Sequence, residues 1–473
     1  ACVHAFVLVV ITGATGGCES SVATEPSPES DAPTAVADAS NTDTSNTERN
    51  ADGIPGVSVR YIIDGPSVFS MPFPTDLRRR GDGSLDLAGF PNPEQNNLVD
   101  AYVQSAATEL DGFSVVPTVY FTFDDAIDVE GLTPTLLTGE AGANVILVNV
   151  DQSSFQYSVR IPVNTRFWSR DDGVYLPANT LTVQPVFGLP LKENTTYACL
   201  VLRNIGDASG QPLGQPGVVQ SGLLGQGPLG DLFAPLNAWL KGFGSDIPQD
   251  QIAAATVFTT GAPTRELERI AAYIRDEVPV SPLSDIVALD EPSAYFSAYE
   301  GLYQSPNFQS GEKPYEVDGG AILFDAAGAP VVQETETLRF AVTVPKGKEM
   351  PAAGWPLVFY GHGTGGDYLS FLRAGGNTPA RMLAQRGLAV LSIDQPLHGD
   401  RGEGSDAVFL SFNFSNPDSA RSNFRQSVAD VLVQLKMAKQ GLSMDTPDGL
   451  VSFDPDSVYF FGHSHGAVVG AML

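Results

Sequence analysis

The feature of this sequence that most constrains its fold is a short glycine motif around Ser464. Residues 458–461 are apolar and aromatic, as in a buried strand, and they run directly into Gly-His-Ser-His-Gly at residues 462–466. The small apolar residues 467–471 that follow favour a helix. Glycines on both sides of so sharp a turn let neighbouring backbone pack closely around it. The pattern predicts a strand, a strained turn with Ser464 at its tip, and a helix. The alternative is an ordinary glycine-rich turn of an α/β fold.

Residues before this motif alternate between strand and helix patterns. Strand-like stretches at 338–344, 356–360 and 388–393 are separated by a helical stretch at 379–386 and followed by a long amphipathic helix. Such alternation predicts a doubly wound, mostly parallel sheet, which we place over residues 290–473.

A second glycine-rich loop follows the strand at 356–360. It reads Gly361, His362, Gly363, Thr364, followed by two more glycines. A phosphate-binding loop is the alternative interpretation, but no Lys accompanies these glycines and their spacing is not that of a P-loop. Acyl transfer builds negative charge on a carbonyl oxygen, and a site for it needs backbone N–H donors fixed nearby. The loop is a candidate source of such a donor.

Together, the two glycine motifs make residues 290–473 resemble the front half of a bacterial α/β-hydrolase. The whole chain is similar to exported bacterial lipases of the virulence-factor type, which carry an Ig-like N-terminal region. The stretches PFPTD at residues 72–76 and FPNP at 90–93 are similar to parts of that region. The resemblance implies an esterase or lipase that acts on an ester or lipid substrate without a metal or organic cofactor.

The resemblance also assigns roles to residues of the two motifs. Ser464 would be the nucleophile, and the backbone N–H groups of Thr364 and His465 would form the oxyanion hole. The supporting residues would be Gly361, His362, Gly363, Gly462 and Gly466. His463 and His465 flank the serine, but side chains next to the nucleophile point away from its hydroxyl, so we do not expect either to be the base.

The order of the catalytic residues in this family is Ser, then Asp or Glu, then His. Only nine residues, 465–473, follow Ser464. We therefore expect the acid and the base to lie beyond Leu473, the chain to be a fragment truncated after the nucleophile, and this polypeptide alone to be nearly inactive.

Residues 56–215 favour β structure. Stretches rich in β-branched and aromatic residues at 115–123, 145–150, 180–186 and 196–202 are separated by turn clusters. This spacing predicts an all-β sandwich, and the resemblance makes it Ig-like. Residues 216–289 show helical periodicity around a strand-like stretch at 253–260, so we expect a mainly helical connection there.

The N-terminal residues suggest export. Residues 1–18 contain a short apolar run that ends at Cys18, similar to the signal segment and lipobox of a bacterial lipoprotein. The polar residues 19–55 cannot offset their ordering entropy by burial and are expected to form a disordered tether. We expect a lipid anchor at Cys18 that holds the protein on a membrane of the bacterial cell envelope. An ordinary cleaved signal with a chance cysteine is the alternative.

Charge and cysteine content narrow the function further. The net charge of −29, from 55 acidic and 26 basic residues, disfavours nucleic acid as a partner. Three cysteines form no zinc-ligand pattern. We expect a serine esterase or lipase that works through an acyl-serine intermediate. The alternatives are a serine peptidase, a polyester depolymerase, or a surface binding lipoprotein with a non-catalytic hydrolase-like domain.

Overall fold

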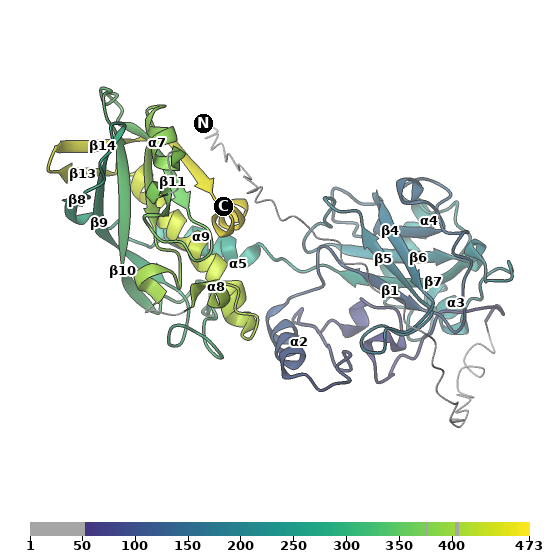
Figure 1. The fold of residues 1–473 in the computed structure, drawn as a ribbon. Coiled ribbons are helices and arrows are strands. Elements are labelled where there is room, and N and C mark those ends of the chain that lie inside the picture. Colours follow the sequence, from purple (N-terminus) through teal and green to yellow (C-terminus); the bar gives the residue numbers. More distant parts are fainter. Residues whose placement is uncertain (1–52, 374–376, 403–405) are drawn as a thin grey trace, which may run out of the picture. The chain divides into compact units, whose positions relative to one another are not determined.

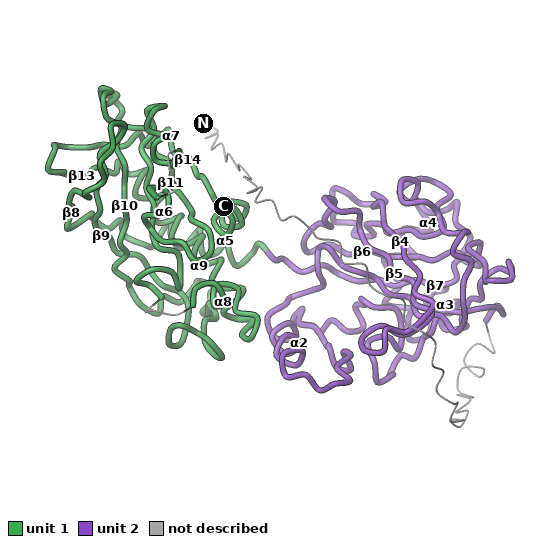
Figure 2. The backbone as a smooth tube through the Cα atoms, viewed as in Figure 1, with its two compact units in different colours: residues 1–24, 264–473 green, residues 25–263 purple. Residues whose placement is uncertain are grey.

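The structure, a computed structural model, describes residues 53–373, 377–402 and 406–473. The described residues divide into two units between Pro263 and Thr264 (Figure 2). The separate connection expected at residues 216–289 is divided between the two units: residues 216–263 belong to the first unit and residues 264–289 to the second. The expected signal segment, Cys18 and nearly all of the expected tether lie outside the described residues.

The first unit contains two antiparallel sheets (Figure 1). The first sheet has the order β1-β5-β4, with β1 (Val119–Thr122), β4 (Val163–Trp168) and β5 (Thr180–Pro185). The second has the order β3-β2-β6-β7, with β2 (Val145–Asn149), β3 (Arg160–Ile161), β6 (Thr196–Leu202) and β7 (Ile252–Thr259). Side chains of both sheets share one hydrophobic core, as in a sandwich. The Ig-like subtype stays a prediction.

Helices explain why the second sheet lacks polar alternation. Every residue of β2 is buried, and so is nearly every residue of β7. Helices α3 (Gly217–Leu223) and α4 (Ala234–Gly242) contribute Val219, Leu236 and Trp239 to the same core, so strand residues on both faces lose contact with water. Helix α2 (Asn97–Glu109), by contrast, has no buried residue.

The PFPTD stretch is tied to β7. The Pro74 carbonyl accepts a hydrogen bond from the Thr256 hydroxyl at 2.6 Å. The Asp76 carboxylate accepts bonds from the backbone N–H of Thr259 at 2.8 Å and from its hydroxyl at 2.6 Å. Strand β7 lies within the expected helical connection, and these bonds show why it belongs with the first unit.

The second unit is built on a seven-stranded sheet with the order β13-β14-β11-β12-β10-β9-β8. Its strands are β8 (Ser284–Ala288), β9 (Phe296–Asn307), β10 (Glu334–Pro345), β11 (Trp355–Gly361), β12 (Ala389–Ile393), β13 (Ser443–Thr446) and β14 (Gly449–Gly462). Only β11 with β12 and β11 with β14 pair in parallel. The other four pairings are antiparallel.

The prediction of a mostly parallel sheet is therefore wrong for this sheet as a whole, which is mixed. Strands β9 and β10 run antiparallel over twelve paired residues, and no helix crosses between them in the described structure. Burial patterns reveal that a strand exists but carry no information about its direction, so β10 could not be told from a parallel strand. Strand–helix alternation holds only around β11, β12 and β14.

Helices cover both faces of this sheet (Figure 1). Helices α6 (Ser370–Arg373) and α7 (Pro379–Ala384) pack on one face. Helices α5 (Arg265–Asp276), α9 (Pro417–Lys439) and α10 (His465–Met472) pack on the other. Helix α9 begins with Asn416 as its N-cap and Pro417 at its first position, both of which favour a helix start.

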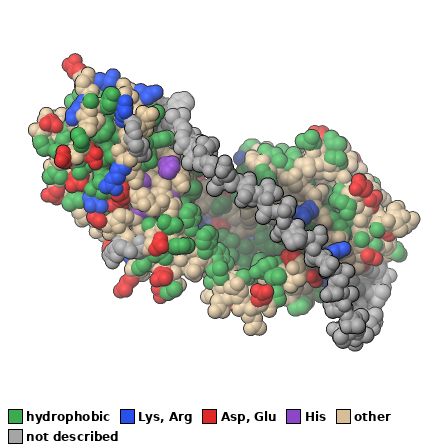
Figure 3. Space-filling view, viewed as in Figure 1, with side chains coloured by type: hydrophobic (Ala, Val, Ile, Leu, Met, Phe, Trp, Pro, Cys, Tyr) green, Lys and Arg blue, Asp and Glu red, His purple; other side chains and the backbone are tan. Residues whose placement is uncertain are grey.

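The surface and the helices add two findings about the described residues. Acidic side chains are scattered over the visible surface of both units rather than gathered in one patch (Figure 3). Among the described residues, no helix has the length and apolarity needed to cross a bilayer.

Candidate active site

Ser464 occupies a strained backbone conformation between β14 and α10. Its φ is 51° and its ψ is −113°, and it is the N-cap residue of α10. A residue with a side chain adopts positive φ only at a cost, so its surroundings must hold it there. The Ser464 side chain is exposed, whereas Gly462, His465 and Gly466 in the same turn are buried. The turn thus presents the serine hydroxyl to solvent.

Glycines create those contacts. A Cβ atom added to Gly466 would lie 2.1 Å from the carbonyl oxygen of Gly361, and one added to Gly462 would lie 2.3 Å from that of Gly466. Neither distance is possible without moving backbone. The end of β11, the end of β14 and the start of α10 therefore touch through their main chains, and this contact holds the turn at Ser464.

The parallel pairing of β11 and β14 brings the two glycine motifs together. Gly361 and Gly462 are direct partners in the register, so both loops leave the same edge of the sheet. The backbone N–H of His463 donates to Gly361 at 2.9 Å, and that of Gly466 donates to His362 at 3.1 Å. A Cβ atom on Gly363 would lie 3.2 Å from the Ser464 Cβ. The His-Gly loop is therefore a direct neighbour of Ser464.

Two backbone donors near Ser464 are unused. Within the described residues, neither the N–H of Thr364 nor that of His465 donates a hydrogen bond to another part of the chain. His465 opens α10, where the first N–H groups have no partner inside the helix and carry its positive dipole end. Both donors are available to an anionic oxygen, although the structure does not show one bound.

His362 locks the shape of its loop. The buried ring donates from Nδ1 to the Gly363 carbonyl at 2.8 Å, and its Nε2 accepts the backbone N–H of Gln395 at 3.1 Å. The Gln395 side chain donates in turn to the His362 carbonyl at 2.5 Å. Burial lowers the pKa of His362 to about 4, so the ring is neutral near pH 7, and the tautomer assigned here follows from these bonds.

The turn after β12, residues 394–398, stabilises the His-Gly loop by hydrogen bonds. Asp394 accepts the backbone N–H of Tyr368 at 2.8 Å and pairs with Arg339 at 3.2 Å. Burial raises the pKa of Asp394. His398 donates from Nδ1 to the Pro396 carbonyl at 2.9 Å, which tightens the turn. The turn at residues 394–398 therefore holds the His-Gly loop, residues 361–366, through Gln395, and Asp394 holds Tyr368 just beyond that loop.

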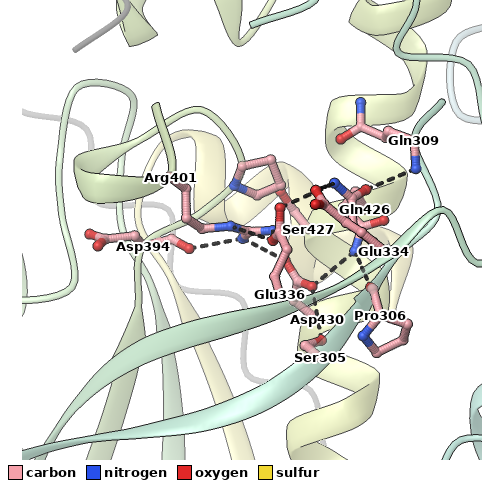
Figure 4. A network of polar contacts seen from close by, with 12 residues as sticks. Ser305, Pro306, Gln309, Glu334, Glu336, Asp394, Arg401, Gln426, Ser427 and Asp430 are labelled. Atoms are coloured by element: carbon pink, nitrogen blue, oxygen red, sulfur yellow. Dashed lines mark hydrogen bonds and ion pairs between the residues drawn. The ribbon is translucent and has the colours of Figure 1, made fainter. Parts of the chain in front are cut away.

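A buried ionic network anchors that turn (Figure 4). Arg401 pairs with Glu336 of β10 and Asp430 of α9, at 2.7 Å in each case, and donates to the Asp394 carbonyl at 3.0 Å. Asp430 also accepts from Gln426 at 3.0 Å, while Glu336 contacts Lys313 as well. Three charges buried together are tolerated only because they are paired and hydrogen-bonded.

The charges of this network respond unequally to burial. Complete burial would lower the pKa of Arg401, but the two carboxylates outweigh it and raise the pKa above its usual range. Burial raises the pKa of Asp430 despite Arg401. For Glu336 burial also acts upward, but the charges of Arg401 and Lys313 prevail and lower its pKa. This network was not predicted from the sequence. The feature that could have indicated it is Asp430, a charged residue among apolar residues on the buried side of a helix.

The two histidines beside Ser464 differ. His463 is exposed, whereas His465 is buried and stacks on Phe424 with ring centroids 4.5 Å apart. Neither ring nitrogen of His465 has a hydrogen-bond partner among the described residues. Burial first, then His398 and His362, lower its pKa to about 3. Its side chain thus points into α9 rather than toward the serine.

No base is bonded to the serine in the described part of the chain. The Ser464 hydroxyl makes no hydrogen bond to any described side chain. The described residues also bring no three His, Cys, Asp or Glu side chains together in a way that could hold a metal ion. The arrangement provides an exposed nucleophile and two free backbone donors.

No protein-family model matches this chain, and no curated protein does. Several solved structures that it resembles in part are described as esterases. An acetyl xylan esterase from Paenibacillus sp. R4 is 18% identical, with a TM-score of 0.26 over 42% of this chain and 50% of that one. Acetyl xylan esterase 1 from Thermoanaerobacterium sp. JW/SL YS485 is 15% identical, with a TM-score of 0.26 over 44% and 53%.

A third similar structure is the rice cell wall degrading esterase LipA from Xanthomonas oryzae. It is 17% identical, with a TM-score of 0.17 over 39% of this chain and 42% of that one. The chain thus spans about half the length of these proteins. Likeness at this level says nothing about the activity or the substrate of this chain.

Proposed function

We propose that this chain carries the nucleophile of a serine esterase of the α/β-hydrolase class. The observation that carries the proposal is the conformation of Ser464, held at positive φ on a strand-to-helix turn by backbone contacts among Gly361, Gly462 and Gly466. Such a turn is costly to build, and its chemical use is to expose a serine hydroxyl beside oriented N–H donors.

In the proposed reaction, the Ser464 oxygen attacks the carbonyl carbon of an ester. The N–H groups of Thr364 and His465 stabilise the negative oxygen of the tetrahedral intermediate. A general base takes the serine proton and passes it to the leaving alcohol, and an acyl-serine remains. The same base takes a proton from water, which hydrolyses the acyl-serine to the free acid and restores the serine. The loop contacts of His362 and Gln395 keep one donor fixed during both steps.

A serine of ordinary pKa needs a base to become a nucleophile. Because no described side chain is hydrogen-bonded to the Ser464 hydroxyl, we propose that residues 1–473 alone turn over esters very slowly. We further propose that the base is a histidine oriented by an Asp or Glu, in the family order Ser, then Asp or Glu, then His.

An apolar segment beside the site supports an amphiphilic or lipid-like ester as the substrate. Val408 and Phe409 of α8 (Ala407–Leu410) are exposed, and so is Phe414 shortly after it. The Val408 side chain lies 3.4 Å from the position of a Cβ on Gly365 in the His-Gly loop. Exposed apolar groups at the edge of a reactive site favour substrates with an apolar part.

Hydrolysis of p-nitrophenyl esters of increasing acyl length tests the proposal. The protein is expressed from its complete reading frame, and Ser464→Ala is measured beside it. We expect turnover with the intact protein and a loss of roughly 10⁴-fold or more in kcat with the variant. Ser443→Ala, a change of an exposed serine on β13, is the control and should keep full activity. Unchanged turnover in Ser464→Ala would overturn the proposal, and cleavage of peptides but not esters would replace it with a peptidase.

A further inference from the structure

A groove of about 640 Å³ lies on the first unit, on the outer face of the sheet β1-β5-β4. Alternate residues of each strand form its floor, because neighbouring side chains point to opposite faces. On β1, Tyr120 faces the groove while Val119 and Phe121 are buried in the core. The volume lies in the range of pockets that bind small ligands. All of its lining residues belong to the first unit, so the groove does not involve Ser464.

Aromatic rings make up a large part of the lining of this groove. Phe69 and Tyr120 meet edge to face, with centroids 5.3 Å apart. Trp168 lies under the guanidinium of Arg166, 3.7 Å from its ring. Tyr175 and Phe187 stand at the rim, and Phe187 is 85% exposed. Phe69, Tyr120 and Trp168 are half-buried, so the groove offers both half-buried and exposed rings, as a binding surface does.

The polar groups of the groove are mostly neutral amides and hydroxyls. Asn164 accepts a bond from Thr135 through its carbonyl oxygen, and within the described residues its NH₂ group donates none. Gln184 donates to the Thr118 hydroxyl at 3.2 Å, and in the same part of the chain its carbonyl oxygen accepts none. Such groups can both donate to and accept from a ligand.

The two charged residues of the groove are already engaged. The Asp172 carboxylate accepts the backbone N–H groups of Val174, Tyr175 and Leu176 at 2.7 to 3.0 Å. The Arg166 guanidinium lies over Trp168. The acidic chain, with a net charge of −29, also repels anions. The lining thus carries one positive and one negative charge and no net charge, which favours a neutral ligand.

We propose that this groove binds a neutral oligosaccharide. The aromatic face carries negative charge density, which attracts the polarised C–H groups on the flat side of a sugar ring. The hydroxyls around that ring donate and accept hydrogen bonds, as do the amides of Asn164 and Gln184. An acyl chain would leave these amides unpaired, which is costly when they lose contact with water. The mixture of rings and neutral polar groups thus fits a saccharide better than a lipid.

Affinity electrophoresis tests this proposal with the full chain. The protein is run through gels that contain a galactomannan, a mixed-linkage β-glucan or dextran, and through gels with alginate or polygalacturonate. We expect retardation in at least one neutral gel and none in the acidic gels. Retardation in none of the neutral gels, or only in the acidic ones, overturns the proposal.

Two phenylalanines of the first unit provide a matched comparison. Phe187 and Phe155 are both 85% exposed, but only Phe187 lines the groove. We expect Phe187→Ala to bind the retarding polysaccharide about tenfold more weakly, and Phe155→Ala to bind it as the original protein does. Trp168→Ala should bind more weakly still. Equal binding by Phe187→Ala and Phe155→Ala would overturn the assignment of the groove. Ser464→Ala should bind normally, so failure of the esterase proposal would not affect this result.

Discussion

The turn at Ser464 and the groove of the first unit are built from different parts of the chain. At the turn, the closest contacts join main-chain atoms, as between Gly466 and Gly361, and the supporting histidine His362 bonds to backbone groups. In the groove, side chains project from the outer face of a sheet. Rings such as Phe187 are exposed and make few contacts with the rest of the protein. We infer that a substitution at the turn disturbs the fold and the chemistry together, whereas a substitution in the groove changes binding alone.

Removing the buried cation Arg401 should have the largest effect on the turn and its supports. Arg401→Met leaves Glu336 and Asp430 buried without their partner, and we expect a loss of roughly 3–5 kcal/mol in the free energy of unfolding. Urea denaturation measures it. Esterase activity of the complete protein should fall as well, because the turn that holds the His-Gly loop loses its anchor.

Arg275→Met is the control for that experiment. Arg275 pairs with Asp276 at 2.7 Å, but both side chains are exposed, so no measurable change is expected. Replacing Arg401, Glu336 and Asp430 together by apolar residues should restore much of the stability. If Arg401→Met were as stable as the original protein, the network would not be the anchor that the structure indicates.

A single added carbon at the turn should have the next largest effect. In Gly466→Ala the new Cβ would overlap the Gly361 carbonyl, so the contact between α10 and β11 must open. We expect a loss of roughly 2–3 kcal/mol in the free energy of unfolding and little remaining esterase activity. Thermal unfolding and ester hydrolysis measure the two effects.

Gly242→Ala separates this packing effect from the general effect of a glycine change. Gly242 lies in α4, and a Cβ there would meet no atom within 4 Å. We expect a gain of about 0.5–1 kcal/mol from the better helix propensity of alanine. If both variants behaved alike, close backbone contact would not explain the turn.

Local patterns in the sequence revealed the turn, because its glycines and its serine are neighbours in the chain. The groove and the ionic network could not be found this way. Arg401 and Glu336 are 65 positions apart, and the rings of the groove come from two strands and from several segments outside the strands. No short window of sequence contains such a set. The antiparallel direction of β9 and β10 was not predicted for a similar reason, because the pairing of a strand depends on partners far along the chain.

The smallest predicted effect concerns His465, whose side chain and backbone have separate roles. The unfolded imidazole binds a proton near pH 6.5, whereas the folded one stays neutral until about pH 3. Stability is therefore complete above pH 6.5 and declines as the pH falls toward 3, because the unfolded state binds more protons there. His362, with a pKa of about 4, contributes in the same direction.

His465→Phe keeps the stacking on Phe424 and removes two buried nitrogens that lack partners. We expect a gain of about 1 kcal/mol at pH 7. Burial also lowers the pKa of His398, so His465 is one of three such histidines, and roughly a third of their decline in stability between pH 6.5 and pH 5 should disappear. His463→Phe changes an exposed side chain of the same turn and is the control. Because only the backbone N–H of residue 465 is proposed to meet the substrate, kcat should stay within about threefold of its original value. A large fall in kcat in His465→Phe, with the fold intact, would show that this side chain takes part in the chemistry. It would contradict the proposal that residue 465 acts through its backbone N–H alone.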